Sequence, residues 1–260
     1  MNMDLELGWR LQPLGGDTGT AYMGTNAEQK LFLKRNASPF LAALSVENIT
    51  PRLVWTKRMS SGDILTAQEW LNGRTLKRSE MKNAAVGRLL HRVHHSELLR
   101  EMLRKVGGKV ISPQNLLLEL ETRLSQSLLV HPLVKQSLEY LKTTINSLGE
   151  DHYEVCHGDL NHKNWLLSDS GRLYLVDWDS AKFADSAYDL SMLLCAYVPV
   201  SDWDEWIENY SGNQVTNEIK NRIRWYSNLY CLTTIQHGFE SQRYHMMNKA
   251  ILLLDNIRNK

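Results

Sequence analysis

Three oxygen-bearing side chains, Asp159, Asn164 and Asp177, occur in an order and spacing that suit chemistry on the phosphates of a nucleotide. Asn164 lies five positions after Asp159, and Asp177 lies thirteen positions after Asn164. Carboxylate and amide oxygens are hard ligands, which suit Mg²⁺ and suit Zn²⁺ poorly. A carboxylate placed ahead of them can accept the proton of an attacking hydroxyl group. The pattern therefore predicts phosphoryl transfer, with Asp159 as the base and with Asn164 and Asp177 as metal ligands.

The residues that flank these side chains strengthen the prediction. The catalytic loop of protein kinases reads H-R-D-x-x-x-x-N, and a later D-F-G supplies a further metal ligand. Here the loop begins with His157, Gly158 and Asp159, and residues 177–179 read D-W-D. A lone D-x-x-x-x-N would be better explained as a turn-capping motif, but this context favours function. We expect His157 to pack and hydrogen-bond within the loop. Asp179 is either a second metal neighbour or a turn residue.

The short segment after Asp177 indicates the type of acceptor. Twelve positions separate Asp177 from Asp189, near which the next helix is expected to begin. That leaves no room for the long activation segment, ending in A-P-E, on which protein kinases dock peptides. The spacing predicts a small-molecule acceptor, and we expect Asp189 to support the loop rather than to react.

The pattern of the first 71 residues predicts the element that holds the nucleotide. Short apolar runs at residues 9–12, 21–24, 31–34, 54–57 and 64–70 are separated by turn residues, which is typical of an antiparallel sheet. Lys34 ends the third run, where a lysine that contacts the α- and β-phosphates is expected. Taken alone, it would be one more surface lysine. A glutamate of the following helix commonly pairs with such a lysine, and Glu47 is the candidate.

Two further parts of this region are expected to contact the nucleotide. Gly16 and Gly19 lie in a glycine-rich turn, where backbone N–H groups can approach phosphate, although a plain hairpin turn explains the glycines equally well. Glu69, Trp70 and Leu71 end the last strand and fit a hinge that binds adenine through backbone groups. Trp70 is alternatively a core residue.

Beyond Asn72-Gly73 the hydrophobic period becomes helical, with helices expected at residues 80–96, 115–129, 133–148, 187–197, 203–210, 217–237 and 243–258. Short strands at residues 153–156 and 173–177 flank the loop. We therefore predict an α+β, protein-kinase-like fold with two lobes. Residues 1–71 form an antiparallel β N-lobe, and residues 72–260 form a mostly helical C-lobe with the catalytic loop and the acceptor site.

Composition excludes several other classes of protein. The chain has 260 residues and a formal net charge of +1, so it lacks the basic field that nucleic-acid binding needs. Its three cysteines are too scattered for a disulfide framework or a C-x-x-C zinc site, which favours reduced thiols in a cytoplasmic protein. No secretory signal is expected at residues 1–7. The most apolar stretch, residues 190–200, is about half as long as a membrane span.

Two clusters of side chains invite a ligand but have simpler explanations. His91, His94 and His95 share one helical face, yet neither a cysteine nor a cluster of acids completes a metal site in the sequence, so core or surface histidines are favoured. Trp203 and Trp206 lie in an acidic aromatic stretch that suits a substrate wall. An ordinary amphipathic helix explains that stretch at least as well.

Taken together, these segments resemble the aminoglycoside phosphotransferase and choline kinase superfamily over nearly the whole chain. Within it, the closest resemblance is to the CcrZ/YtmP-type proteins of Gram-positive bacteria. It is carried by A-Y-M-G at residues 21–24, A-Q-E-W-L at 67–71, H-G-D at 157–159, N-W at 164–165 and Y-L-V-D-W-D-S at 174–180. The last two segments are the more specific ones.

The resemblance implies a cytosolic, ATP- and Mg²⁺-dependent kinase of small hydroxylated molecules, with ribose or 2-deoxyribose as acceptors. It also implies a role coupling cell division to chromosome replication, with recruitment to the division site and a partner such as FtsZ. It carries the base role to Asp159, the Mg²⁺ roles to Asn164 and Asp177, and the phosphate role to Lys34. Choline, ethanolamine and aminoglycoside kinases stay open as alternatives, as does a kinase-fold module whose main role is protein binding.

Overall fold

The computed structural model describes residues 9–14, 20–149, 153–213 and 215–259. The chain forms two compact units. The first comprises residues 1–76, 97–107 and 163–179, and the second comprises residues 77–96, 108–162 and 180–260. Each unit is therefore built from stretches that are distant in sequence.

An antiparallel five-stranded sheet dominates the first unit and has the order β1-β2-β3-β5-β4. Its strands are β1 (Arg10–Pro13), β2 (Ala21–Thr25), β3 (Lys30–Arg35), β4 (Leu53–Arg58) and β5 (Ile64–Glu69). Alternate side chains of β3, Leu31 and Leu33, are buried in a cluster with Leu65 and Ala67 of β5. This period of two places one face of the sheet on the core. The predicted antiparallel sheet is confirmed.

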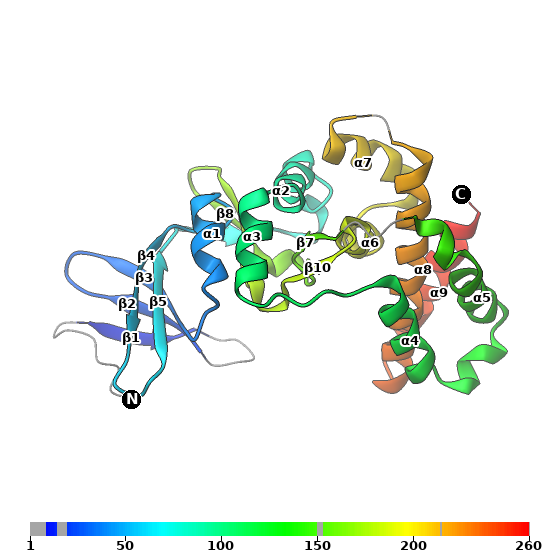
Figure 1. Ribbon diagram of the computed structural model, residues 1–260, viewed down its shortest axis with the longest axis horizontal. Coiled ribbons are helices and arrows are strands. Elements are labelled where there is room, and N and C mark those ends of the chain that lie inside the picture. Colours follow the sequence, from blue (N-terminus) through cyan, green and yellow to red (C-terminus); the bar gives the residue numbers. More distant parts are fainter. Residues whose placement is uncertain (1–8, 15–19, 150–152, 214, 260) are drawn as a thin grey trace. The chain divides into compact units, whose positions relative to one another are not determined.

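Two helices and three short strands complete the first unit. They are α1 (Phe40–Val46), α3 (Glu97–Lys105), β6 (Gly73–Thr75), β8 (Trp165–Ser168) and β9 (Leu173–Leu175). Helix α1 begins after Ser38, whose Oγ accepts a hydrogen bond from the Phe40 N–H at 3.2 Å. Helices α1 and α3 lie side by side (Figure 1). The sequence analysis missed α3, although the buried Leu99 and Leu103 have helical spacing.

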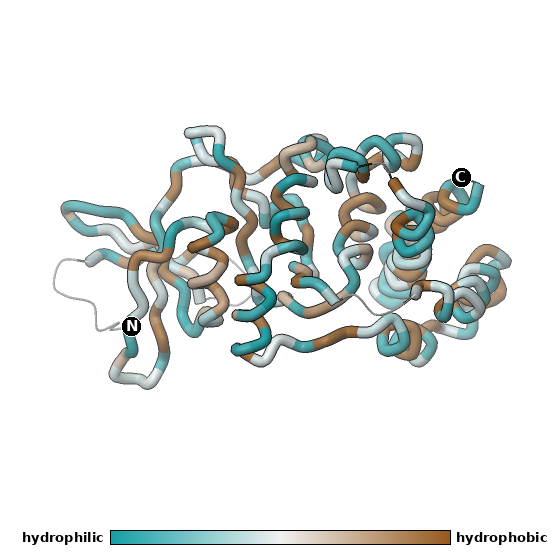
Figure 2. The backbone as a smooth tube through the Cα atoms, turned by 45° about the horizontal axis from the view of Figure 1, so that its top comes forward, coloured by the Kyte–Doolittle hydropathy of each residue, from teal (hydrophilic) through white to brown (hydrophobic). Residues whose placement is uncertain are grey.

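The second unit is mostly helical. Its helices are α2 (Ala84–His94), α4 (Pro113–Arg123), α5 (Pro132–Thr144), α6 (Ser186–Tyr197), α7 (Trp203–Ser211), α8 (Asn217–Glu240) and α9 (Tyr244–Arg258). Brown and teal stretches alternate along these helices in Figure 2, as expected where each helix buries one side. Helix α8 packs against α6, α9 and α5. Buried Trp225 and Tyr226 lie near its middle.

The predicted helices exist, and several are shorter than expected. The helix expected at residues 80–96 begins only at Ala84, after a 3₁₀ turn at Arg78–Glu80. The helix expected at residues 115–129 ends at Arg123, and a 3₁₀ turn follows at Gln126–Val130. Two short strands, β7 (Glu154–Cys156) and β10 (Lys182–Ala184), pair antiparallel in this unit. Among the described helices, none has the length and apolar run needed to cross a bilayer.

Candidate active site

The β8–β9 hairpin of the first unit brings Asn164 and Asp177 together. Trp165 pairs with Leu175, so the residues just outside both strands lie at the same end of the hairpin. The N–H of Val176 donates to the carbonyl oxygen of Asn164 at 2.9 Å. One β-hairpin therefore spans the thirteen positions from Asn164 to Asp177. The apolar run that begins at Trp165 is the sequence signal for β8, which the sequence analysis overlooked.

Asp177 has an uncommon backbone conformation. Its φ is 65°, in the left-handed region that side chains other than glycine rarely adopt. Aspartate tolerates this region better than most residues, because its short polar side chain can bond locally. Next to it, Trp178 is buried, and its indole N–H donates to the carbonyl oxygen of Leu175 at 2.9 Å. The turn that aims the Asp177 carboxylate is thus fixed by packing on its far side.

Lys34 contacts two of the acids singled out in the sequence. Its Nζ lies 3.3 Å from Asp177 Oδ1 and donates to both carboxylate oxygens of Asp179 at 2.8 Å. Since Leu31 and Leu33 face the core, the alternation of β3 turns Lys34 to the opposite face of the sheet. The two carboxylates are 54% and 55% exposed, and the Lys34 side chain is 19% exposed. The result is an open cluster of one cation and two anions.

The predicted pairing of Lys34 with Glu47 is not found. The ion pairs of Lys34 are with Asp177 and Asp179 in the part of the chain that the structure describes. Glu47 follows the last residue of α1, a helix of seven residues that packs against α3 and β4.

The other predicted nucleotide contacts are placed as follows. Gly16 and Gly19 lie outside the described residues. Glu69, Trp70 and Leu71 follow each other at the end of β5, and all three are half-buried. The Glu69 carboxylate accepts from Arg52 at 3.4 Å, and the Lys30 ammonium lies 4.0 Å from the centre of a Trp70 ring. Trp70 is thus partly open and carries a cation on its face.

In the second unit, side chains of α6 hold the backbone of the loop that contains Asp159. The two oxygens of Asp189 accept the N–H groups of His157 and Gly158 at 2.7 and 2.9 Å. The sulfur of Met192 accepts the N–H of Leu160 at 3.4 Å. This ladder continues to the end of the helix, where the hydroxyl of Tyr197 accepts the N–H of His162 at 3.0 Å.

These contacts confirm two structural expectations. His157 is fully buried, and its Nδ1 accepts the N–H of Asp159 at 3.2 Å, so it bonds within the loop as predicted. Asp189 supports the loop, as predicted. Asp159 is exposed, while its neighbours on both sides along the chain are held by α6. Its place in the loop is thereby set by backbone contacts.

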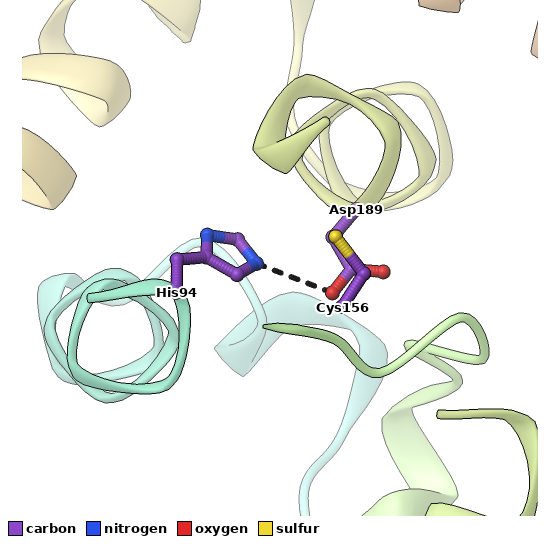
Figure 3. A group of neighbouring side chains, drawn as sticks. All are labelled: His94, Cys156 and Asp189. Carbon is purple, nitrogen blue, oxygen red and sulfur yellow. Dashed lines mark hydrogen bonds and ion pairs between the residues drawn. The ribbon is translucent and has the colours of Figure 1, made fainter. Parts of the chain in front are cut away.

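Asp189 also belongs to a buried network that the sequence analysis did not foresee. His94 Nε2 lies 3.2 Å from Asp189 Oδ2, and His94 Nδ1 lies 2.7 Å from the Tyr210 hydroxyl. The side chains of His94 and Asp189 are fully buried. Figure 3 shows His94 reaching from one helix toward Asp189 on another, with Cys156 beside the carboxylate. The helical period of α2, with Val86, Leu90 and Val93 buried, was the available signal that His94 faces inward.

The chemistry of this network fits structural support and does not fit a metal ion. Burial opposes the charge of Asp189, but the hydrogen bond and charge of His94 and the N–H of Gly158 bring the pKa of the carboxyl below its ordinary value. Burial and the nearby Asp189 raise the pKa of the Cys156 thiol well above its ordinary value. A thiol that stays protonated is a poor metal ligand, and both His94 nitrogens already have partners. Asp189 and Cys156 are the acid and the cysteine that His94 lacked in the sequence. Asp189 accepts hydrogen bonds from the loop, and the Cys156 thiol donates to backbone carbonyl oxygens of Ala184 and Asp185.

A cavity of about 430 Å³ lies in the second unit, and its size suits a small ligand. It is lined by residues of α4, α6, α8 and α9, among them Tyr188, Met192, Tyr226 and Tyr230. Met192 also accepts the Leu160 N–H, so the wall of the cavity continues into the loop beside Asp159. Burial, aided by the charge of Asp189 and more weakly by that of Asp159, raises the pKa of Tyr188 to about 12.

The aromatic stretch of α7 does not line this cavity. Trp203 and Trp206 are 5% and 4% exposed, and the Trp206 ring stacks on Tyr210 at a centroid distance of 6.2 Å. The Trp203 indole N–H donates to the carbonyl oxygen of Val198 at 3.1 Å. The amphipathic-helix explanation therefore holds, and the two tryptophans are core residues.

The exposed carboxylates fit a divalent cation. Asp177 and Asp179 present oxygens to solvent, and the only cation that contacts them among the described residues is Lys34. Asn164, which carries an amide side chain, adjoins Asp177 at the same end of the hairpin through its backbone. Oxygen ligands of this kind, with room left for water and phosphate oxygens, are what Mg²⁺ requires. In the sequence, neither a cysteine nor a histidine adjoins the two acids.

A β-sheet unit with a lysine over two acids and a helical unit with a buttressed H-G-D loop define an enzyme of the kinase-like phosphotransferase class. The sequence model of the phosphotransferase enzyme family (APH) matches residues 22–214. The chain belongs to this family. It is an ATP-dependent phosphotransferase that acts on a hydroxyl group and uses Mg²⁺ with the nucleotide.

Solved structures confirm the predicted α+β, kinase-like fold. Choline kinase LicA from Streptococcus pneumoniae is 18% identical with a TM-score of 0.63, and the match covers 96% of this chain and 95% of LicA. A choline/ethanolamine kinase family protein from Mesorhizobium loti is 15% identical with a TM-score of 0.69, covering 96% and 88%. The GDP and kanamycin complex of APH(2")-IIia is 13% identical with a TM-score of 0.64, covering 96% and 93%.

Proposed function

We propose that this phosphotransferase transfers the γ-phosphoryl group of ATP to a hydroxyl group of a small sugar-type acceptor, of which ribose and 2-deoxyribose are the candidates. The wall of the cavity carries the proposal. Apart from one glutamate, one arginine and one histidine, its polar groups are neutral hydrogen-bonding groups, and they include three tyrosines, two threonines and a glutamine. A polyhydroxylated neutral molecule offers partners for many such groups.

The charges of the cavity support a neutral acceptor. Glu119 and Arg123 both line it, and they lie 3.6 Å apart one helical turn from each other on α4. Arg123 also pairs with Glu240 at 3.3 Å. The wall therefore has no unpaired negative charge that would attract a polycation such as an aminoglycoside.

We assign the roles in this reaction to the residues that the sequence singled out. Asp159 accepts the proton of the acceptor hydroxyl, and Lys34 binds the phosphates of the nucleotide. Asn164 and Asp177 are the residues that would hold Mg²⁺, with Asp179 beside them. The ion, when bound, neutralises the phosphate charge that develops during transfer. Residues 1–71 would serve the nucleotide, with Glu69, Trp70 and Leu71 beside adenine and Gly16 and Gly19 beside phosphate, and residues 72–260 would serve the acceptor.

Choline or ethanolamine is the second candidate, because a specific feature favours it. Tyr188, Tyr226 and Tyr230 all line the cavity, and aromatic faces bind quaternary ammonium groups. The Tyr188 and Tyr226 rings meet edge to face at 6.2 Å. Against this candidate, the Glu119 carboxylate on the same wall is already paired with Arg123.

An acceptor screen of ATP turnover tests the proposal. Ribose, 2-deoxyribose, choline, ethanolamine and kanamycin are compared with purified protein and Mg²⁺, and product phosphate esters are identified by mass spectrometry. We expect the pentoses to be phosphorylated and D159N to lose turnover while it still binds nucleotide. Turnover of choline or kanamycin without turnover of pentoses would overturn the sugar proposal.

The role in cell division, an FtsZ-type partner and recruitment to the division site stay predictions that rest on the resemblance. They are tested apart from catalysis. If the kinase-fold module acts mainly by binding proteins, a strain that carries only D159N grows and divides like the wild type. If phosphorylation carries the role, D159N behaves like the deletion.

A further inference from the structure

One cation of the second unit, Lys182, lies beside the loop that contains Asp159. Lys182 begins strand β10 and pairs in register with Cys156, the residue before His157. Antiparallel pairing therefore places Lys182 where β7 runs into the loop. A Cβ atom added at Gly158 would lie 2.7 Å from Lys182 Cε and 3.0 Å from Lys182 Nζ. The ammonium group thus occupies the space where a side chain at position 158 would be.

Within the ranges that the structure describes, no anionic partner accounts for the position of Lys182. None of the ion pairs among the described residues includes it, although the residue is half-buried. Its Nζ lies 5.4 Å from the centre of the Tyr188 ring, a cation–π contact. Tyr188 in turn lines the cavity. The lysine therefore lies between the loop and the wall of the cavity, and no described carboxylate pairs with it.

We propose that Lys182 is a catalytic residue that binds the oxygens of the phosphoryl group while this group passes to the acceptor. The inference rests on the proposed assignment of Asp159 as the base. The acceptor oxygen must lie within about 3 Å of the Asp159 carboxylate to give up its proton. The phosphorus atom that this oxygen attacks is one bond further away. A cation against the backbone of Gly158, the neighbour of Asp159, is close to that point.

The step requires charge stabilisation and no further reactant. The acceptor oxygen forms a bond to the γ-phosphorus while the bond from that phosphorus to the bridging oxygen of ADP breaks. The electron pair of the broken bond leaves with ADP, and the hydroxyl proton passes to Asp159. Negative charge is spread over the three equatorial oxygens of the group in transit. An ammonium group already in place stabilises that charge without reorganisation.

The same geometry explains the glycine of the H-G-D motif. Gly158 has a φ of 79°, and an added Cβ would also meet the carbonyl oxygen of Ser180 at 2.7 Å. Any side chain at position 158 would displace Lys182. In this chain glycine stands at the loop position that holds arginine in protein kinases. Lys182 of strand β10 places its ammonium group in the space that a side chain there would fill.

The test compares Lys182→Met with Lys220→Met. Methionine keeps the length and removes the charge of the lysine, and Lys220 is a matched control because it pairs with Asp204 at 3.1 Å on the α7–α8 side of the unit. We expect kcat of K182M to fall roughly 100-fold, as for the loss of one group that stabilises a transition state, while K220M keeps the wild-type rate. The rate is measured with whichever acceptor the wild type phosphorylates, or with water when only hydrolysis of ATP is seen. Failure of the sugar proposal therefore changes the acceptor in the assay and not the comparison.

A binding measurement separates a catalytic role from packing and needs no acceptor. The complex of ADP, Mg²⁺ and aluminium fluoride mimics the phosphoryl group in transit. K182M should bind ADP and Mg²⁺ with wild-type affinity and lose at least about 10-fold in affinity when aluminium fluoride is added. Wild-type kcat in K182M, or an equal loss of affinity with and without aluminium fluoride, would overturn the proposal.

Discussion

The Lys34 cluster of the first unit and the His94 network of the second unit are built from similar groups and behave differently. In the first, two aspartates meet an ammonium group and remain more than half exposed. In the second, one aspartate meets an imidazole and two backbone N–H groups and is fully buried. The carboxylates of Asp177 and Asp179 share one ammonium group and remain accessible to a ligand from solvent. Both oxygens of Asp189 are buried and accept hydrogen bonds from groups of the protein. Exposure and the number of internal partners thus separate a binding carboxylate from a supporting one.

The largest effect is expected from Asp177→Asn, which breaks the open cluster. If Asp177 holds Mg²⁺ as we propose, loss of its carboxylate should lower kcat by about 1,000-fold. The melting temperature should change little, because exposed ion pairs contribute only about 0–1 kcal/mol. Steady-state kinetics and thermal unfolding measure the two effects. Asp169→Asn at the turn of the same β8–β9 hairpin is the matched control, with wild-type kinetics expected.

Asp189→Asn, in contrast, should lower the stability of the fold as well as kcat. An amide cannot accept from His94, His157 and Gly158 together, so buried donors lose partners and the free energy of unfolding should fall by about 3 kcal/mol. Chemical denaturation measures this loss, and kcat should fall with it because the loop is released. A D189N protein with wild-type stability would show that the buried network does not support the fold.

The stability difference between the wild type and D189N should depend on pH. The pKa of Asp189 is lowered in the folded protein. Its contribution is therefore fully present above the ordinary aspartate pKa near 4 and is lost as the pH falls through the lowered value. Denaturation curves between pH 7 and pH 5 should show a constant difference between the two proteins. Below about pH 4 the difference in the free energy of unfolding should shrink, because protonation removes the ionised Asp189 carboxylate from the wild type, and the variant never had it.

Tyr210→Phe weakens the same network at its edge. It removes the hydroxyl that lies 2.7 Å from His94 Nδ1 and leaves a buried nitrogen without its partner. The expected loss in the free energy of unfolding is about 1–2 kcal/mol. Tyr244→Phe, on a side chain that is 54% exposed, should change the stability by less than about 0.5 kcal/mol. Equal effects of both variants would mean that the bond to His94 is unimportant.

The smallest effect is expected where the loop meets the cavity. Met192→Leu keeps the volume and removes the sulfur that accepts the Leu160 N–H. One net hydrogen bond corresponds to a loss in kcat of about 3- to 10-fold. Met192→Gln offers an amide oxygen at a similar reach and should recover most of that loss. Equal rates in both variants would indicate that the methionine acts through its volume alone.

Spacing in the sequence is enough to single out candidate reacting side chains, whereas the groups that support them come from distant positions. Asp159, Asn164 and Asp177 have fixed spacing within short local elements, and a hairpin needs no distant contact to bring its ends together. Lys34 was singled out by its place on the third strand. Its ion pair with Asp177, 143 positions away, depends on tertiary packing and could not be read from the sequence.

The remaining omissions have the same cause. The link between His94 and Asp189 spans 95 positions, and the contact of Lys182 with Gly158 depends on strand pairing between β7 and β10. The cavity collects residues from four helices. The hydrophobic period of a sequence shows which face of a helix or strand is buried. It does not show which distant residues that face contacts.

The anchoring of the loop on α6 has a consequence for mutational tolerance. Asp189, Met192 and Tyr197 accept backbone N–H groups, which nineteen of the twenty amino acids supply alike. Proline is the exception, because it has no N–H to donate. In a saturation library at His162, proline should therefore stand apart from every other replacement. We therefore expect substitutions of side chains in this loop to leave the path of its backbone unchanged. Such substitutions could alter the preference for an acceptor without disturbing the fold.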